Sequence, residues 1–235
     1  MQQTKFTGPE RVAIENAIAG RKSVRAFLDK PVSRQTVEHL LEVASRAPSG
    51  TNMQPWRAHV VAGEAKDRLS RAILDEFLAG GMARGKSEYK YYPDQFFEPY
   101  QSRRRKVGFD MYGLLGIARG DTAAMTKQLS QNYTFFGAPV GIMFTVDRRL
   151  EIGSWLDYGY FLEALCVAAR ANGLETCSQQ AFAYFHTQIR EQLAFDPNEV
   201  LVCGFALGYA DWSATINTLE TTRSPVEEFA TFQGF

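Results

Sequence analysis

The sequence predicts a single α+β domain, on three observations. Short apolar runs of strand length alternate with amphipathic stretches of helix length, and one longer stretch is apolar around almost its whole circumference. The composition is that of an ordinary globular protein, with 45% apolar and 22% charged residues. No internal repeat or linker divides the chain, so residues 1–235 are expected to form one domain.

The first half of the chain contains two predicted helices and one predicted strand. Ser33 is suited to cap a helix that continues to about Arg46, because apolar residues recur there at three- and four-residue spacing. The apolar run 59–62 predicts a strand, and residues 64–78 predict an amphipathic helix that ends at two glycines.

The second half adds three predicted strands. Residues 139–146 are apolar on both faces, which is typical of a strand in a sheet covered on both sides. Residues 174–177 and 200–207 predict two more buried strands, with a helix at about 184–193 between them.

The stretch 152–171 predicts a helix that is buried on nearly all sides, because large apolar side chains surround it before the stop at Gly173. A chain of this size has little room to enclose such a helix. Part of the helix surface is therefore predicted to lie in a subunit interface, with a central core helix as the alternative.

Charge and cysteine usage narrow the function classes. The 26 basic and 26 acidic side chains balance, so no overall field attracts the protein to nucleic acid or anionic lipid. No stretch approaches the apolar length of a membrane span and the first residues lack a signal-peptide core, so a cytoplasmic location is expected. The three cysteines and three histidines are scattered, which favours buried thiols and no metal site.

Residues 82–108 differ from the rest of the chain by being polar, aromatic and basic. Aromatic rings interleaved with arginines can stack bases and pair phosphates, so a single-stranded nucleic-acid site is one interpretation. A cover over an active site or a solvated helical hairpin explains the composition as well.

Two short segments carry the candidate ligand-binding residues. Cations and a hydroxyl gather in the first, RKSVRAF, and form either a phosphate clamp or a solvated basic turn: Arg21, Lys22, Ser23 and Arg25. In the second, APSGTNMQPW, the amides of Asn52 and Gln54 match the donor and acceptor edge of a flavin pyrimidine ring, or belong to a loop that ends the preceding helix.

These two segments, in this order, resemble the nitroreductase family of FMN enzymes, whose members carry R-x-S-x-R/K-x-F followed by P-S-x-x-N-x-Q-P-W. The resemblance continues through FFGAPVGI, GLETCSQQAF, GYAD and TTRSP and so spans nearly the whole chain. The aromatic middle segment is similar to the branch that includes nitrobenzoate reductases.

The resemblance implies a nitroreductase-like fold, in which helices flank a central mixed, mostly antiparallel sheet and a long central helix lies at a dimer interface. It also implies that two subunits build each FMN site. One subunit would contribute Arg21, Lys22, Ser23, Arg25, Gln54 and Arg223, and the second subunit would contribute Pro48, Ser49, Gly50 and Asn52.

By the same resemblance, a backbone N–H at Gln180 and Ala181 would point at flavin N5 and polarise it for hydride transfer. Many members have an acidic residue and a glycine at these two positions, and proline is frequent at Ser178. Some members also have lysine where this chain has Thr221. Cys177 beside the turn is interpreted as a buried thiol, with a redox thiol as the alternative.

The implied function is reduction of nitroaromatic or quinone-like acceptors with NAD(P)H by a ping-pong mechanism through FMN. Residues 84–108 are the predicted substrate cover, with substrate candidates Tyr91, Tyr92, Phe96, Phe97 and Arg103.

Two alternatives stay open. Within the same fold, a reductive dehalogenase of halophenols or halotyrosines could use Glu88 and Tyr92, which would face one way on a lid helix. From a different class, a single-stranded nucleic-acid-binding protein would use the aromatic and basic middle segment as its platform.

Overall fold

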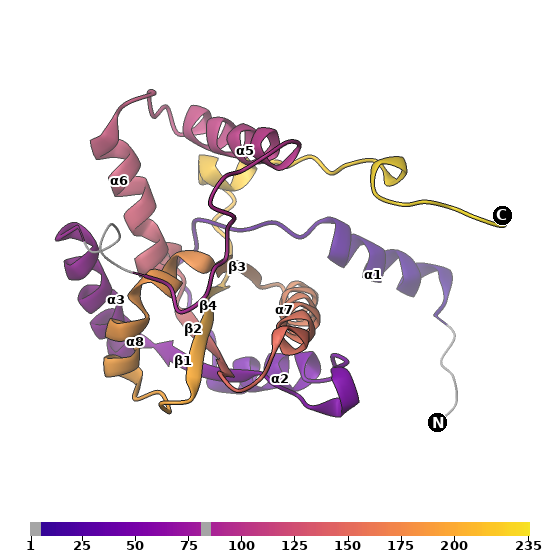
Figure 1. Ribbon diagram of the computed structural model, residues 1–235, viewed down its shortest axis with the longest axis horizontal. Coiled ribbons are helices and arrows are strands. Elements are labelled where there is room, and N and C mark those ends of the chain that lie inside the picture. Colours follow the sequence, from indigo (N-terminus) through magenta and orange to yellow (C-terminus); the bar gives the residue numbers. More distant parts are fainter. Residues whose placement is uncertain (1–5, 81–85) are drawn as a thin grey trace.

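A four-stranded sheet with the order β1-β2-β4-β3 forms the centre of this computed structural model, which describes residues 6–80 and 86–235 (Figure 1). All three strand pairs are antiparallel. The strands are β1 (Arg57–Ala62), β2 (Val140–Asp147), β3 (Glu175–Gln179) and β4 (Glu199–Gly208). A single parallel bridge joins Ser23 to Thr176 at the outer edge of β3, so the sheet is mixed only at that edge.

Two helical layers cover the sheet (Figure 1). One layer contains α2 (Arg34–Ala44) and α7 (Ile152–Ala171), and the other contains α3 (Gly63–Leu78) and α8 (His186–Leu193). Successive side chains of a strand point to opposite faces, and each face therefore has its own apolar core. This arrangement confirms the predicted α+β, nitroreductase-like fold.

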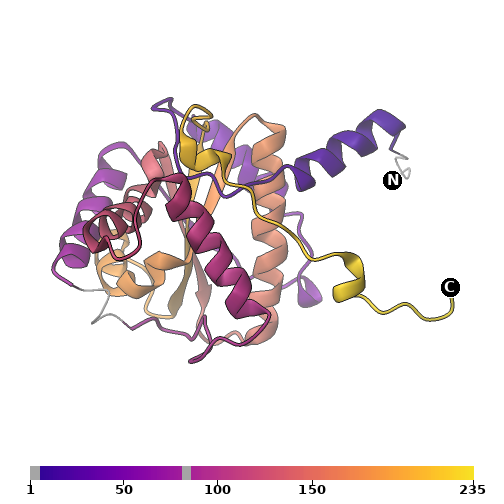
Figure 2. The ribbon, with the colours of Figure 1, turned by 90° about the horizontal axis from the view of Figure 1, so that it is seen from above.

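Three further helices lie outside these layers. They are α1 (Gly8–Ala19), α5 (Tyr100–Leu114) and α6 (Thr122–Ser130), and none of them contains a fully buried residue. In both ribbon views α1 and the C-terminal segment project from the body, and the C-terminal segment first passes beside α5 (Figure 2). These helices were not predicted, apart from the helical hairpin considered for residues 82–108.

The predicted strands and sheet-covering helices are all present, with boundaries shifted by one or two residues. Ser33 caps α2 as predicted, because its Oγ accepts a hydrogen bond of 3.0 Å from Thr36 N. The helix predicted at 184–193 begins as a 3₁₀ turn, Gln180–Phe185, that continues into α8.

The predicted burial of α7 on nearly all sides is not reached within one chain. One side of α7 packs on the sheet and α2, while Leu156 and Tyr160 on the other side remain 63% and 49% exposed. Within residues 6–80 and 86–235, no helix combines the length and apolar character needed to cross a bilayer.

Candidate active site

The basic segment lies along the outer edge of β3 and faces a hollow of about 690 Å³. Val24 N donates a hydrogen bond of 3.0 Å to Thr176 O, which holds the segment beside the strand. The residues around the hollow include four cations and Ser23: Arg21, Lys22, Arg25 and Arg223. The fold therefore brings Arg223 to the predicted phosphate clamp from the other end of the chain.

A buried amide, Asn217, fixes the backbone of this segment. Its side chain is 4% exposed, and its Oδ1 accepts a hydrogen bond of 2.8 Å from Arg25 N. Its Nδ2 donates to Ala26 O and Asp211 O, each at 2.8 Å. Sequence reasoning missed Asn217, because no local pattern marks an asparagine that bonds to a segment about 190 residues away.

The hollow has an excess of positive charge. Two carboxylates line it, and each lies 3.4 Å from a cation, in the pairs Arg21–Glu163 and Lys22–Glu220. The side chain of Glu163 is about half exposed and that of Glu220 is mostly exposed, so these pairs contribute little to stability. Two cations remain without a carboxylate partner among the described contacts, which suits the hollow to a dianionic phosphate.

A second hollow, of about 230 Å³, adjoins the first and shares Arg21, Ser23 and Glu163 with it. It extends to Ser178 near the end of β3, past Gly159 of α7, where a Cβ would meet no atom within 4 Å. The two hollows together form an elongated site, with cations at one end and Ser178 at the other. Ser178 begins the turn of residues 178–181 at the end of β3 (the β3 turn), whose Gln180 and Ala181 line neither hollow.

Hydrogen bonds of two side chains, Gln179 and Gln180, hold the β3 turn in place. Gln179 is buried and donates a hydrogen bond of 2.6 Å to Asn132 O. Gln180 and Ala181, the predicted N5-facing pair, begin the 3₁₀ turn and are partly exposed. The side chain of Gln180 donates a hydrogen bond to Tyr89 Oη, which donates in turn to Val202 O.

Tyr89 was not among the predicted site residues, although its aromatic segment was. Its ring packs against Trp155 of α7 with centroids 4.4 Å apart. Burial raises the pKa of Tyr89 far above its ordinary value, so the phenol stays protonated and acts as a hydrogen-bond donor.

The loop 48–54 contains three residues that are not glycine in a left-handed conformation: Thr51, Asn52 and Gln54, with φ of 48°, 61° and 49°. Ser49 Oγ accepts from Gln54 N at 3.0 Å, and Gly50 N donates to the Asp157 carboxylate of α7 at 3.2 Å. Such backbone conformations cost energy and persist where surrounding contacts enforce them, often at functional sites.

This loop does not join the basic segment within one chain. None of the predicted FMN contacts on the loop lines either hollow: Pro48, Ser49, Gly50, Asn52 and Gln54. Gln54, which the resemblance grouped with the basic segment, lies on the loop with the others. In terms of the predicted FMN contacts, one chain therefore presents two partial sites, one at the edge of β3 and one at the loop beside Asp157.

Four of the predicted substrate candidates lie apart from the hollows, whereas the fifth, Arg103, lines a third hollow of about 1070 Å³ together with Arg223. The rings of Tyr91 and Tyr92 pack edge to face with centroids 4.6 Å apart, and the centroids of the Tyr92 and Phe96 rings are 5.3 Å apart. Arg103 donates a hydrogen bond of 2.5 Å to Ser224 Oγ. None of the candidates, Phe97 included, lines the two hollows, whereas Val107 of α5 lines the larger one. Positions 84 and 85 of the predicted cover lie outside the described residues.

The prediction of Glu88 and Tyr92 on one face of a lid helix is wrong. Residues 86–99 contain no helix, and the Glu88 carboxylate lies 3.0 Å from the guanidinium of Arg148. The Glu88 carboxylate is thus paired with a cation of the chain itself and does not lie on a lid helix, so the dehalogenase alternative loses the arrangement that motivated it.

The three cysteines are free and buried, as predicted. Burial raises the pKa of Cys177 to about 11 and that of Cys203 to about 12. Iodoacetamide at pH 8 is therefore expected to leave all three thiols of the native protein unmodified and to alkylate them after unfolding, as measured by mass spectrometry. Rapid native alkylation of Cys177 would restore the redox-thiol alternative.

Comparisons with known proteins agree with this geometry. A model of the nitroreductase family matches residues 18–209. The chain is 42% identical over 221 residues to a 4-nitrobenzoate reductase of Pseudomonas putida, covering 93% of this chain and 94% of the relative. It is 37% identical to a chloronitrobenzene nitroreductase of Comamonas testosteroni, covering 95% and 98%.

Solved structures agree as well. The FMN and NADPH-dependent nitroreductase NfnB of Sphigopyxis sp. strain HMH matches with a TM-score of 0.90 and 37% identity over 94% of this chain and 99% of that one. NfnB of Mycobacterium smegmatis, solved in complex with NADPH, matches with a TM-score of 0.90 and 31% identity over 95% and 99%. The chain belongs to the nitroreductase family.

Proposed function

We propose that the protein is a homodimeric, FMN-dependent oxidoreductase that reduces nitroaromatic acceptors with NAD(P)H. The observation that carries the proposal is the elongated pair of hollows, with four cations at one end and Ser178, the first residue of the β3 turn, at the other. The names of the relatives, nitrobenzoate and chloronitrobenzene reductases, support nitroaromatic compounds as the acceptors.

The residues present fit FMN. The phosphate would be held by Arg21, Lys22, Ser23, Arg25 and Arg223, whose excess positive charge needs an anion. The N–H groups of Gln180 and Ala181 would face the flavin ring near N5, on a turn fixed by the buried Gln179 side chain. When bound, FMN supplies the chemistry by accepting hydride from NAD(P)H and passing reducing equivalents to the acceptor.

The chain's own contribution is binding and orientation. Fixed backbone N–H groups stabilise negative charge without reorganising, which is the main way in which this turn can lower the barrier. A ping-pong order follows if donor and acceptor stack in turn on the same flavin face. A quinone would meet the same requirement of a flat, reducible ring.

Two observations support the proposed homodimer: the separation of the two partial sites within one chain and the exposed apolar surface. In a dimer, the loop 48–54 of one subunit would complete the FMN site of the other. The apolar side chains left exposed on α7 and α1 would then have a partner, as would Phe229 and Phe232 in the projecting C-terminal segment.

Replacing Leu156 with lysine is expected to convert the dimer to monomer and to release FMN, because a charge would enter the proposed α7 interface. The matched control is Leu78→Lys, which places the same charge at a leucine with similar exposure, 69% against 63%, on α3 in the opposite layer. Sedimentation velocity measures the outcome. A Leu156→Lys protein that remains dimeric would exclude this face as the interface.

The test of function is an absorbance spectrum of the purified protein, followed by anaerobic NADH or NADPH and then a nitroaromatic. Flavin bands that bleach and recover are expected. A colourless protein that cannot be reconstituted with FMN would overturn the proposal. Exclusive halide release from halophenols would instead favour dehalogenation, and tight binding of single-stranded oligonucleotides at low salt would favour the nucleic-acid alternative.

A further inference from the structure

We propose that Glu88 is a positioning residue, which anchors the segment 86–92 so that Tyr89 holds Gln180 in the geometry needed for hydride transfer. The inference rests on the proposed function, because it assigns Gln180 to the flavin ring. It starts from a buried carboxylate that the binding site itself does not use.

The Glu88 side chain is only 15% exposed and faces three basic groups from two other elements. Its Oε1 lies 3.0 Å from Arg148 Nη2, just beyond β2, and 3.5 Å from Arg190 Nη2 on α8. Its Oε2 lies 3.7 Å from His186 Nδ1. His186 Nε2 also bonds to Lys86 O at 3.1 Å, so α8 holds the segment at two points.

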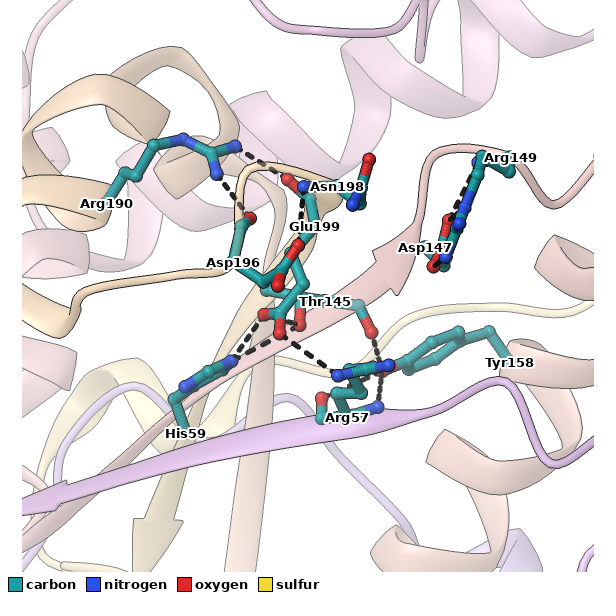
Figure 3. Close-up of polar contacts among 10 residues, drawn as sticks. All are labelled: Arg57, His59, Thr145, Asp147, Arg149, Tyr158, Arg190, Asp196, Asn198 and Glu199. Carbon is teal, nitrogen blue, oxygen red and sulfur yellow. Dashed lines mark hydrogen bonds and ion pairs between the residues drawn. The ribbon is translucent and has the colours of Figure 1, made fainter.

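The two arginines are themselves fixed by backbone carbonyls at the start of β4. Arg190 donates to Asp196 O at 2.9 Å and to Glu199 O at 2.6 Å, and Figure 3 shows its guanidinium lying against this turn. Arg148 donates to Pro197 O at 3.0 Å. The cations are therefore already in place when the Glu88 carboxylate meets them, which reduces the entropy cost of the contact.

The turn 196–199 is itself held by a buried hydrogen-bond network that spans β1, β2 and β4 (Figure 3). The Glu199 carboxylate accepts from Thr145 Oγ1 at 2.6 Å and lies 2.7 Å from His59 Nε2 on β1. Glu199 is 5% exposed, and a network of this kind is rigid when its members are satisfied. Glu88 is thus connected, through Arg190 and the backbone of Glu199, to this buried network.

The next residue transmits this anchorage to the site. The hydroxyl of the adjacent Tyr89 bridges Val202 O on β4 and the Gln180 side chain. The Tyr89 ring packs on Trp155. Any shift of Glu88 moves the adjacent Tyr89 backbone. Asp94, two residues beyond the segment, also forms an ion pair. Its side chain is 86% exposed and bonds only to Lys90, so it provides no comparable anchor.

The test compares Glu88→Gln with the matched control Asp94→Asn, which removes an exposed carboxylate two residues beyond the segment, and with Glu88→Asp, which keeps the charge. Hydrogen exchange of peptides covering 86–92 is expected to rise in Glu88→Gln and to stay near wild type in Asp94→Asn. This arm needs no activity, so it reports on the anchor even if the protein proves not to be a nitroreductase.

In the kinetic arm, Glu88→Gln is expected to lower kcat about tenfold, with Glu88→Asp intermediate and the affinity for FMN unchanged, because the phosphate end is untouched. Combining Glu88→Gln with Tyr89→Phe should cost little more than either change alone, since both act through Gln180. Multiplicative losses in the double variant, or faster exchange without a change in kcat, would overturn the proposal.

Discussion

Alanine at Gly204 is expected to lower the free energy of unfolding by about 3 kcal/mol, the upper end for overpacking a core. A Cβ there would lie 2.2 Å from Cδ2 of Phe182, closer than any real Cβ contact. Phe182 cannot move aside easily, because it is fully buried and stacks on Phe135 with centroids 4.9 Å apart. The same contact seats the 3₁₀ turn that carries Gln180, so hydride transfer should slow as well.

Urea unfolding followed by fluorescence measures this effect. Gly113→Ala on α5 is the control, because a Cβ there meets no atom within 4 Å and the change should be neutral or slightly stabilising. Replacing the Phe182 ring with the smaller leucine side chain, in Gly204→Ala/Phe182→Leu, should recover part of the lost stability. A Gly204→Ala protein as stable as wild type would mean that the 3₁₀ turn does not pack on β4 as described.

Glutamine at Arg223 is expected to raise the Kd for FMN at least about tenfold, which corresponds to the loss of one charge-assisted hydrogen bond to phosphate. The stability of the apoprotein should hardly change, because Arg223 is exposed and bonds only locally, to Thr221 Oγ1 at 2.8 Å and to nearby carbonyls. The dependence of FMN binding on salt should also weaken, since one cation fewer contributes.

Titration of apoprotein with FMN, followed by quenching of flavin fluorescence, gives the Kd. Arg149→Gln is the control, because this exposed arginine pairs with Asp147 in a turn that lines neither hollow. An unchanged Kd in Arg223→Gln would remove the C-terminal arginine from the phosphate site and leave the basic segment alone to bind it.

Sequence periodicity predicted the elements that pack on the sheet and missed those that do not. α2 and α3 present one apolar side to the sheet, which the spacing of their apolar residues reveals. α5 (YQSRRRKVGFDMYGL) buries no residue completely, and its sequence has no apolar face for a periodicity argument to detect. It contacts the C-terminal segment beside it, for example through the ion pair Arg103–Glu228 at 3.3 Å.

The residues of the candidate site likewise divide into those that the sequence could predict and those that it could not. The basic segment and the loop 48–54 are contiguous in sequence, so local composition and the family resemblance could single them out. Asn217, Tyr89 and Glu88 contact partners about 60 to 190 residues away, and the fold alone creates those contacts. The roles of the individual FMN and substrate residues are predictions, and Arg223→Gln tests one of them.

The separation of the two partial sites within one chain has a genetic consequence. A chain defective in Arg223 and a chain defective in Asn52 would damage different halves of the proposed FMN site. In a mixed dimer, one site would combine both defects while the other would combine two intact halves. Coexpressed in equal amounts, two inactive variants should therefore restore about one quarter of the wild-type sites. Recovery of activity from such a pair would show directly that each flavin belongs to two polypeptides.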